Sequence, residues 1–92
     1  MTLKTDLELK LLRAARYDIE KDVHYYICWS LSSMASASTS IQQIVWGLQR
    51  EILEFLDGEM SVRLWLDDEC SPELIKFFQL AIIDTLISRR QR

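Results

Sequence analysis

The apolar residues between positions 41 and 56 recur at steps of three and four, which is the spacing of one face of an α-helix. A capping box precedes them, formed either by Thr39 with Gln42 or by Ser40 with Gln43. Gly58 stands where a residue in the left-handed conformation would close the helix. We therefore predict a helix over 40–57, whose inward stripe consists of Ile41, Ile44, Val45, Leu48, Ile52, Phe55 and Leu56.

The end of the chain has a second strong helix signal. Ser71 suits an N-cap and Pro72 suits the first helical position. The residues that follow are apolar over most of the helical circumference, which predicts a helix over 72–88. Arg89 and Arg90 would then lie at the negative end of the helix dipole.

The first third of the chain has the same helical periodicity, and it can be divided into helices in two ways. Thr5 and Glu8 form a capping box in front of a predicted helix over 6–20. Helical spacing continues over 23–34 with no glycine or proline, which predicts a second helix, either separate or joined to the first through a kink. The serine-rich stretch 30–40 is the clearest linker, because serine competes for backbone hydrogen bonds.

These signals predict an all-α fold, a small bundle of four main helices plus one short helical turn over 61–67. The 92 residues include two glycines and one proline, and no segment alternates as a strand does. We find no internal repeat, so we predict a single helical domain over residues 1–92.

The charge pattern is uneven along the chain. The formal net charge is −3, which disfavours a dedicated nucleic-acid binder. Residues 23–50 carry a single charged side chain, Arg50, whereas 51–73 hold eight acids against Arg63 alone, a net of −7. This acidic stretch either docks on a basic surface of a partner or is a solvated helix end and loop.

The sequence predicts a protein that does not span a membrane and that binds neither a metal ion nor a cofactor. The first ten residues lack the apolar core of a signal peptide, and no window is apolar enough to span a membrane. Cys28 and Cys70 lack paired spacing, and one histidine with two cysteines does not supply a structural zinc site. We predict a cytoplasmic protein with reduced thiols and no cofactor.

One pair of residues suggests an enzyme. His24 and Cys28 are four positions apart, so on a helix they would share one face, and a thiol beside an imidazole can act as a nucleophile. A free cysteine more often behaves as a small buried hydrophobe. No glycine-rich loop offers an oxyanion hole or a phosphate cradle, and we therefore predict that the protein is not an enzyme.

The aromatic residues point to contacts with other chains. A helix with bulky residues on every face cannot hide all of them within so small a monomer, and interfaces are rich in aromatic rings. We therefore expect a homo-oligomer, in which the last helix shares the contact. The predicted partner-binding residues are aromatic or acidic: Tyr25, Tyr26, Trp29, Trp65, Glu59, Asp67, Asp68 and Glu69.

Four short motifs, in order, resemble a pattern in small uncharacterised all-helical proteins of tailed bacteriophages and prophages. The first three are Leu-Leu-x-x-Ala-Arg at 11–16, aromatic-Ile-Cys-x-small-Leu at 26–31, and a turn ending in Leu-Trp-Leu at 62–66. The fourth, at 79–87, is similar to Arg-Leu-x-Trp-Leu-Asp-x-Leu-Ile, with Gln79 and Ile82 replacing the Arg and Trp. The resemblance implies a phage setting, in which such proteins often bind and inhibit host proteins, and it supplies no functional residues.

The leading prediction is a non-enzymatic protein–protein interaction module. It would be a homo-oligomeric, phage-encoded modulator or inhibitor of a host protein, acting in the cytoplasm of a bacterial host. One alternative is a structural or assembly component of a phage particle. The other is a cysteine-dependent enzyme that uses Cys28 and His24.

Overall fold

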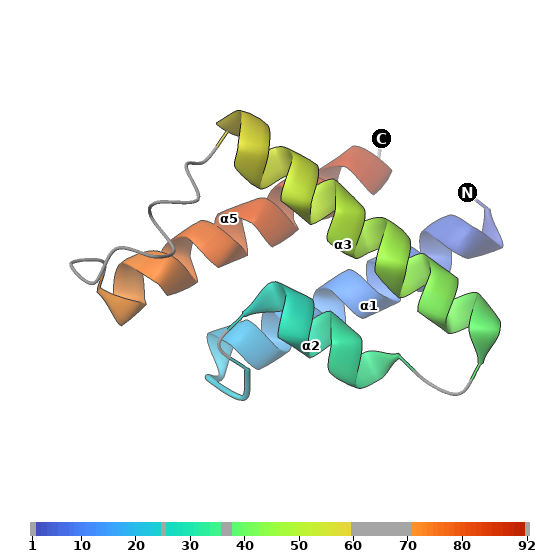
Figure 1. Ribbon diagram of the computed structural model, residues 1–92, viewed down its shortest axis with the longest axis horizontal. Coiled ribbons are helices and arrows are strands. Elements are labelled where there is room, and N and C mark those ends of the chain that lie inside the picture. The colour runs from blue at the N-terminus through green and yellow to red at the C-terminus, as the bar shows by residue number, and fades with distance from the viewer. Residues whose placement is uncertain (1, 25, 36–37, 60–70, 92) are drawn as a thin grey trace.

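A computed structural model describes residues 2–24, 26–35, 38–59 and 71–91 of the chain (Figure 1). Four helices lie within these ranges: α1 (Leu3–Glu20), α2 (Ile27–Met34), α3 (Thr39–Glu59) and α5 (Pro72–Arg90). No strand is present in the same ranges, so the predicted all-α class is confirmed. The short turn expected over 61–67 lies outside the described residues.

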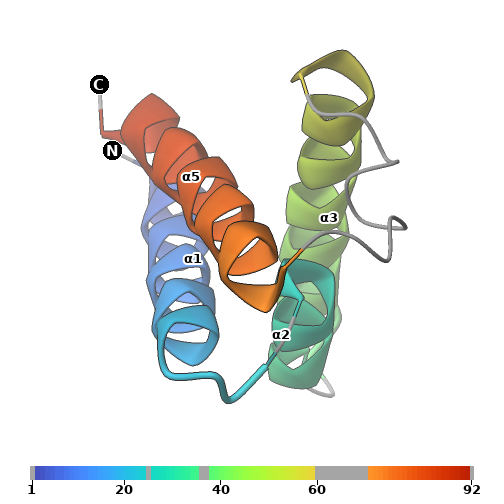
Figure 2. The same ribbon diagram turned by 90° about the vertical axis from the view of Figure 1, so that its left-hand side faces the viewer.

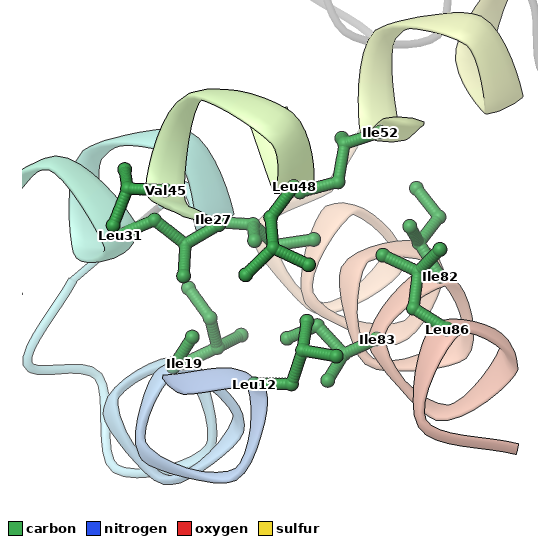
Figure 3. Close-up of a cluster of buried hydrophobic side chains, with 11 residues drawn as sticks. Leu12, Ile19, Ile27, Leu31, Val45, Leu48, Ile52, Ile82, Ile83 and Leu86 are labelled. Carbon is green, nitrogen blue, oxygen red and sulfur yellow. The ribbon is translucent and has the colours of Figure 1, made fainter. Parts of the chain in front are cut away.

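The helices form two layers. Figure 2 shows α1 and α5 side by side in one layer and α2 and α3 in the other. Helix α1 packs against each of the other three, and most extensively against α5. The apolar core fills the space between the layers, and every helix contributes to it (Figure 3). Its largest members are Leu12, Ile19, Leu31, Leu48, Ile52, Ile82, Ile83 and Leu86.

Helix α5 begins as the sequence predicts. Ser71 is the N-cap, and its side chain accepts a hydrogen bond from the Leu74 N–H at 3.1 Å. Pro72 follows in the first turn. The helix ends at Arg90, two residues beyond the predicted end.

The starts of α1 and α3 differ from the predictions. The N-cap of α1 is Thr2, whose side chain accepts from the Thr5 N–H at 3.2 Å, so the helix includes one more turn and Thr5 is not the cap. In α3 the first helical residue is Thr39, and the Gln42 N–H donates to the carbonyl of Ser38. This helix also continues through Gly58, so Gly58 does not close it.

The expected helix over 23–34 begins four residues late, because the chain turns sharply at Asp22. Asp22 has φ of 59°, the left-handed conformation that usually requires glycine. Its N–H donates to the Ile19 carbonyl, and the Val23 N–H donates to the Asp18 carbonyl at 2.8 Å. These two bonds form a Schellman motif with aspartate in the glycine position. Helices α1 and α2 are therefore separate.

Gln79 of α5 provides the missing cap of α2. The residue before α2, Tyr26, makes no side-chain capping hydrogen bond. Instead the Ile27 N–H donates to Gln79 Oε1 at 2.6 Å, and Gln79 is only 1% exposed. A polar side chain in the core thus satisfies a helix N–H that would otherwise be buried without a partner.

Two further polar contacts hold α2 in place. On the α1 side, Ser30 is fully buried, and its Oγ donates to Asp18 Oδ2 at 3.0 Å. On the α3 side, Gln49 Nε2 donates to Ser32 Oγ at 2.8 Å. With the Gln79 cap included, α1, α3 and α5 each make a directed hydrogen bond to α2. These bonds fix the position of α2 more specifically than apolar packing alone.

Arg90, at the end of α5, joins three helices. Its guanidinium donates to Glu8 of α1 at 2.7 Å and forms a second ion pair with Glu51 of α3. It also donates to the carbonyl of Leu86 in its own helix at 3.0 Å. The side chains of Arg90 and Glu8 are each 14% exposed, so this cluster is largely withdrawn from water.

Candidate functional site

Two tryptophans of the α2–α3 layer stand out into solvent. Trp29 of α2 is 63% exposed and Trp46 of α3 is 60% exposed. Trp29 rests edge-to-face on Tyr26, with ring centroids 5.2 Å apart. Tryptophan is normally well buried on average, so two such rings on one small chain mark a surface that could gain by being covered.

Both rings lie in a segment of the sequence without formal charge, and Arg50, one turn beyond Trp46, is the first charged residue after it. Residues 23–49 contain no aspartate, glutamate, lysine or arginine, although charged residues make up 27% of the chain. This stretch forms all of α2 and the first half of α3. The polar side chains of this stretch are therefore neutral ones, chiefly serine and glutamine.

Gln49 places the two rings on a common face. Its Nε2 donates both to the Cys28 carbonyl at 3.0 Å and to Ser32 Oγ at 2.8 Å, which joins the two helices. Trp46 lies one turn before Gln49, and Trp29 lies one turn before Ser32. Both rings are largely exposed, and each lies one turn from a member of the Ser32–Gln49 hydrogen bond, which favours a shared side of α2 and α3. We name Trp29, Ser32, Trp46 and Gln49 the uncharged face.

The structure tests only part of the predicted partner-binding set. Trp29 is exposed as expected, and Tyr26 is half-buried beneath it. Glu59 is the last residue of α3, and nothing is described of its side chain. The remaining members lie outside the described residues: Tyr25, Trp65, Asp67, Asp68 and Glu69. The predicted acidic surface therefore stays a prediction.

Three exposed aromatic residues of the described chain are missing from that set. Tyr17, Trp46 and Phe77 are 59%, 60% and 64% exposed. The sequence holds a signal for Trp46, because it lies off the inward stripe that runs through Val45, Leu48 and Ile52. Phe77 is harder to find, since apolar residues surround most of α5 and no single stripe is evident there.

The proposed pair of His24 and Cys28 does not form on a helix. His24 lies before α2, and its Nε2 is 3.3 Å from Ser33 Oγ. Cys28 lies in α2, half-buried beside the core. Burial raises the pKa of the Cys28 thiol, which opposes formation of the nucleophilic thiolate. This arrangement lacks the activation that a catalytic cysteine needs.

The reactivity of Cys28 provides a direct check. In a Cys70→Ser variant, we expect the folded protein at neutral pH to react with an aromatic disulfide reagent about tenfold more slowly than the same chain in urea. The physical reason is that burial disfavours the thiolate. A folded-state rate equal to or above the unfolded one would show an activated thiol and would revive the enzyme hypothesis.

A cleft lies between the α1–α2 turn and the start of α5. Its volume is about 240 Å³, and its lining includes Ile19, His24 and Pro72. The Lys76 ammonium lies across it, 3.2 Å from the Asp22 carboxylate. No group of three histidine, cysteine, aspartate or glutamate side chains able to hold a metal ion occurs among the described residues.

No protein-family model, curated protein or solved structure matches this chain. Within the described part of the chain, no helix combines the length and the hydropathy that a membrane crossing requires. The uncharged face is therefore assessed from its own chemistry alone.

Proposed function

We propose that the protein is a non-enzymatic protein–protein interaction module that works as a homo-oligomer. The observation that carries this proposal is the exposure of Trp29 and Trp46, 63% and 60%, on a face without formal charge. Tryptophan is prominent among the residues that dominate binding energy at interfaces, because a large ring gains much when water leaves it. Charged residues are depleted at interface centres, as they are here.

The chemistry of the described residues favours contact over catalysis. The Cys28 thiol is partly buried and deactivated, and His24 is engaged with Ser33. The buried polar side chains Ser30 and Gln79 make contacts within the fold, where they support α2. These groups have structural roles, whereas most of the surface of the Trp29 and Trp46 side chains is left open to water.

The phage setting and the action on a host protein remain part of this proposal through the sequence resemblance alone. That resemblance includes the motif at 26–31, which contains Trp29 of the uncharged face. An interaction module of this kind would act by covering a surface of its target.

Sedimentation equilibrium tests the proposed function. The chain has a mass of 10.9 kDa, and we expect the average mass to rise towards that of two or more chains as the concentration increases through the micromolar range. Quenching of tryptophan fluorescence by acrylamide should fall over the same range, because association covers exposed indole rings. A constant mass of one chain at every concentration would refute self-association.

A further inference from the structure

We infer that the uncharged face of α2 and α3 binds the same face of a second copy of this chain, in a two-fold symmetric dimer. The inference rests on the proposed function and names the surface and the partner. In a symmetric pair each residue of the face meets residues of the same face, so the surface must be complementary to itself.

The absence of charge is the first argument for self-pairing. Like charges brought together across an interface are strongly unfavourable, and a neutral face avoids that cost when it meets its own copy. From Val23 to Gln49 no side chain has a formal charge, and Arg50, one turn beyond Trp46, is the first one at the edge. The chain as a whole has a net charge of −3, so other faces of two copies repel each other more.

The hydrogen-bonding groups of the face also suit a second copy. Gln49 donates its amide hydrogens within the chain, to the Cys28 carbonyl and to Ser32 Oγ, so the face offers the Ser32 hydroxyl as a donor and Gln49 Oε1 as an acceptor. A carboxylate only accepts and an ammonium only donates, so two identical charged groups could not satisfy each other. Hydroxyl and amide groups can, which makes the polar part of the face self-complementary along with its aromatic part.

Another exposed ring, Phe77 on α5, lies in a less suitable setting. Glu73 and Asp84 share its outward stripe, one on each side of it. Asp84 is also paired with Arg16 of α1 at 2.8 Å, so covering this face would remove several charged groups from water. The main apolar residues of α5 are in addition buried in the core of the same chain, including Ile82, Ile83 and Leu86.

The dimensions of the face predict a weak dimer. Two packed helices give a width of about 20 Å, and the uncharged part of α3 is about 16 Å long. A face of this size, on the order of 320 Å² per partner, is well below the roughly 800 Å² per partner of a standard interface. We therefore expect a weak, transient dimer that dissociates in the high micromolar range, which sedimentation at high protein concentration resolves.

Matched substitutions test the inference by sedimentation equilibrium of the full chain. Trp29→Ser and Trp46→Ser should each raise the dissociation constant at least about tenfold, as expected for central aromatic anchors. Phe77→Ser is the control, because Phe77 is as exposed as Trp29, 64% against 63%, and likewise packs edge-to-face on a neighbouring ring, Phe78. It should leave the dissociation constant within about twofold of the wild-type value.

A charge pair provides a second test that does not depend on removing a ring. Ser32→Glu and Ser32→Lys should each weaken self-association, because each places like charges in the same interface. An equimolar mixture of the two variants should recover a dimer, since the faces are then complementary. Circular dichroism of each variant checks that the fold is retained.

The outcomes separate this inference from the proposed function. A wild-type chain that stays monomeric overturns both. A chain that self-associates but is insensitive to the Trp29, Trp46 and Ser32 substitutions overturns the inference alone, as does one that is weakened only by Phe77→Ser. The inference is supported if the mixture of Ser32→Glu and Ser32→Lys recovers the dimer and Phe77→Ser keeps the dissociation constant of the wild type.

Discussion

Replacement of Gln79 by alanine is expected to lower the free energy of unfolding by about 3 kcal/mol. Two costs combine. The side chain is 1% exposed, so its removal leaves a cavity in the core. The Ile27 N–H also loses the oxygen that accepts its hydrogen bond at 2.6 Å, and an unpaired buried donor is costly. Urea denaturation followed by circular dichroism measures the change.

Two further variants separate these costs. Gln79→Leu keeps most of the side-chain volume and removes the hydrogen-bond acceptor. We therefore expect it to lower the free energy of unfolding by about 2 kcal/mol relative to the wild type. Gln43→Ala removes an exposed glutamine from α3 and should change the stability by less than about 0.5 kcal/mol. If Gln79→Leu were as stable as the wild type, the hydrogen bond to α2 would have no energetic importance.

The same residue shows which part of the fold sequence analysis could not reach. Helical periodicity is a short-range property, so the segments that become α3 and α5 were predicted to within two residues at each end. The cap of α2 joins Ile27 to Gln79, which are 52 positions apart. No local pattern indicates such a pair, and Gln79 reads as an ordinary polar position on a helix.

The start of α2 was predicted four residues too early for a different reason, although the end of α1 at Glu20 was predicted correctly. Helical spacing of the apolar residues continues across the break between these helices, and no glycine or proline interrupts them. The break depends on Asp22 adopting φ of 59°, which aspartate does more readily than most residues but far less often than glycine. A Schellman motif with aspartate therefore gave no recognisable signal in the sequence.

The candidate site was predicted in part. Aromatic excess in a small chain indicates an exposed surface, and Trp29 fulfils that expectation. The structure adds neutral groups that the sequence analysis did not include, contributed by Ser32 and Gln49, whereas the predicted acidic side chains stay untested. The proximity of Ser32 and Gln49 depends on how α2 packs against α3, and the spacing of residues along the chain does not determine that packing.

Replacement of Arg90 by alanine is expected to cost about 3 kcal/mol at neutral pH. The substitution leaves two carboxylates, Glu8 and Glu51, 14% and 26% exposed, without the cation between them. Arg89→Ala is the matched control, because Arg89 is 47% exposed and its guanidinium lies 3.4 Å from Glu51. An exposed ion pair of this kind contributes less than about 1 kcal/mol, so we expect a correspondingly small effect.

The pH dependence distinguishes ion pairing from packing of the Arg90 side chain. Burial by itself would raise the pKa of Glu51, but the hydrogen bonds and charge of Arg90, aided by Arg89, outweigh it and hold that pKa below its ordinary value of 4.5. A carboxyl group whose pKa is lowered by folding stabilises the fold at pH values above its ordinary pKa. This stabilisation disappears as the pH falls through the folded-state pKa. In Arg90→Ala the larger cause of the lowering is gone, only the exposed Arg89 remains beside Glu51, and burial favours protonation of Glu51.

We therefore expect the difference in unfolding free energy between wild type and Arg90→Ala to narrow from about 3 kcal/mol at neutral pH to less than about 1 kcal/mol near pH 3. Urea denaturation across this pH range measures both proteins under identical conditions. A difference that stays constant with pH would mean that Arg90 stabilises the fold through the packing of its aliphatic stem. A difference that narrows would assign the stabilisation to its charge, which links α1, α3 and α5 at one end of the bundle.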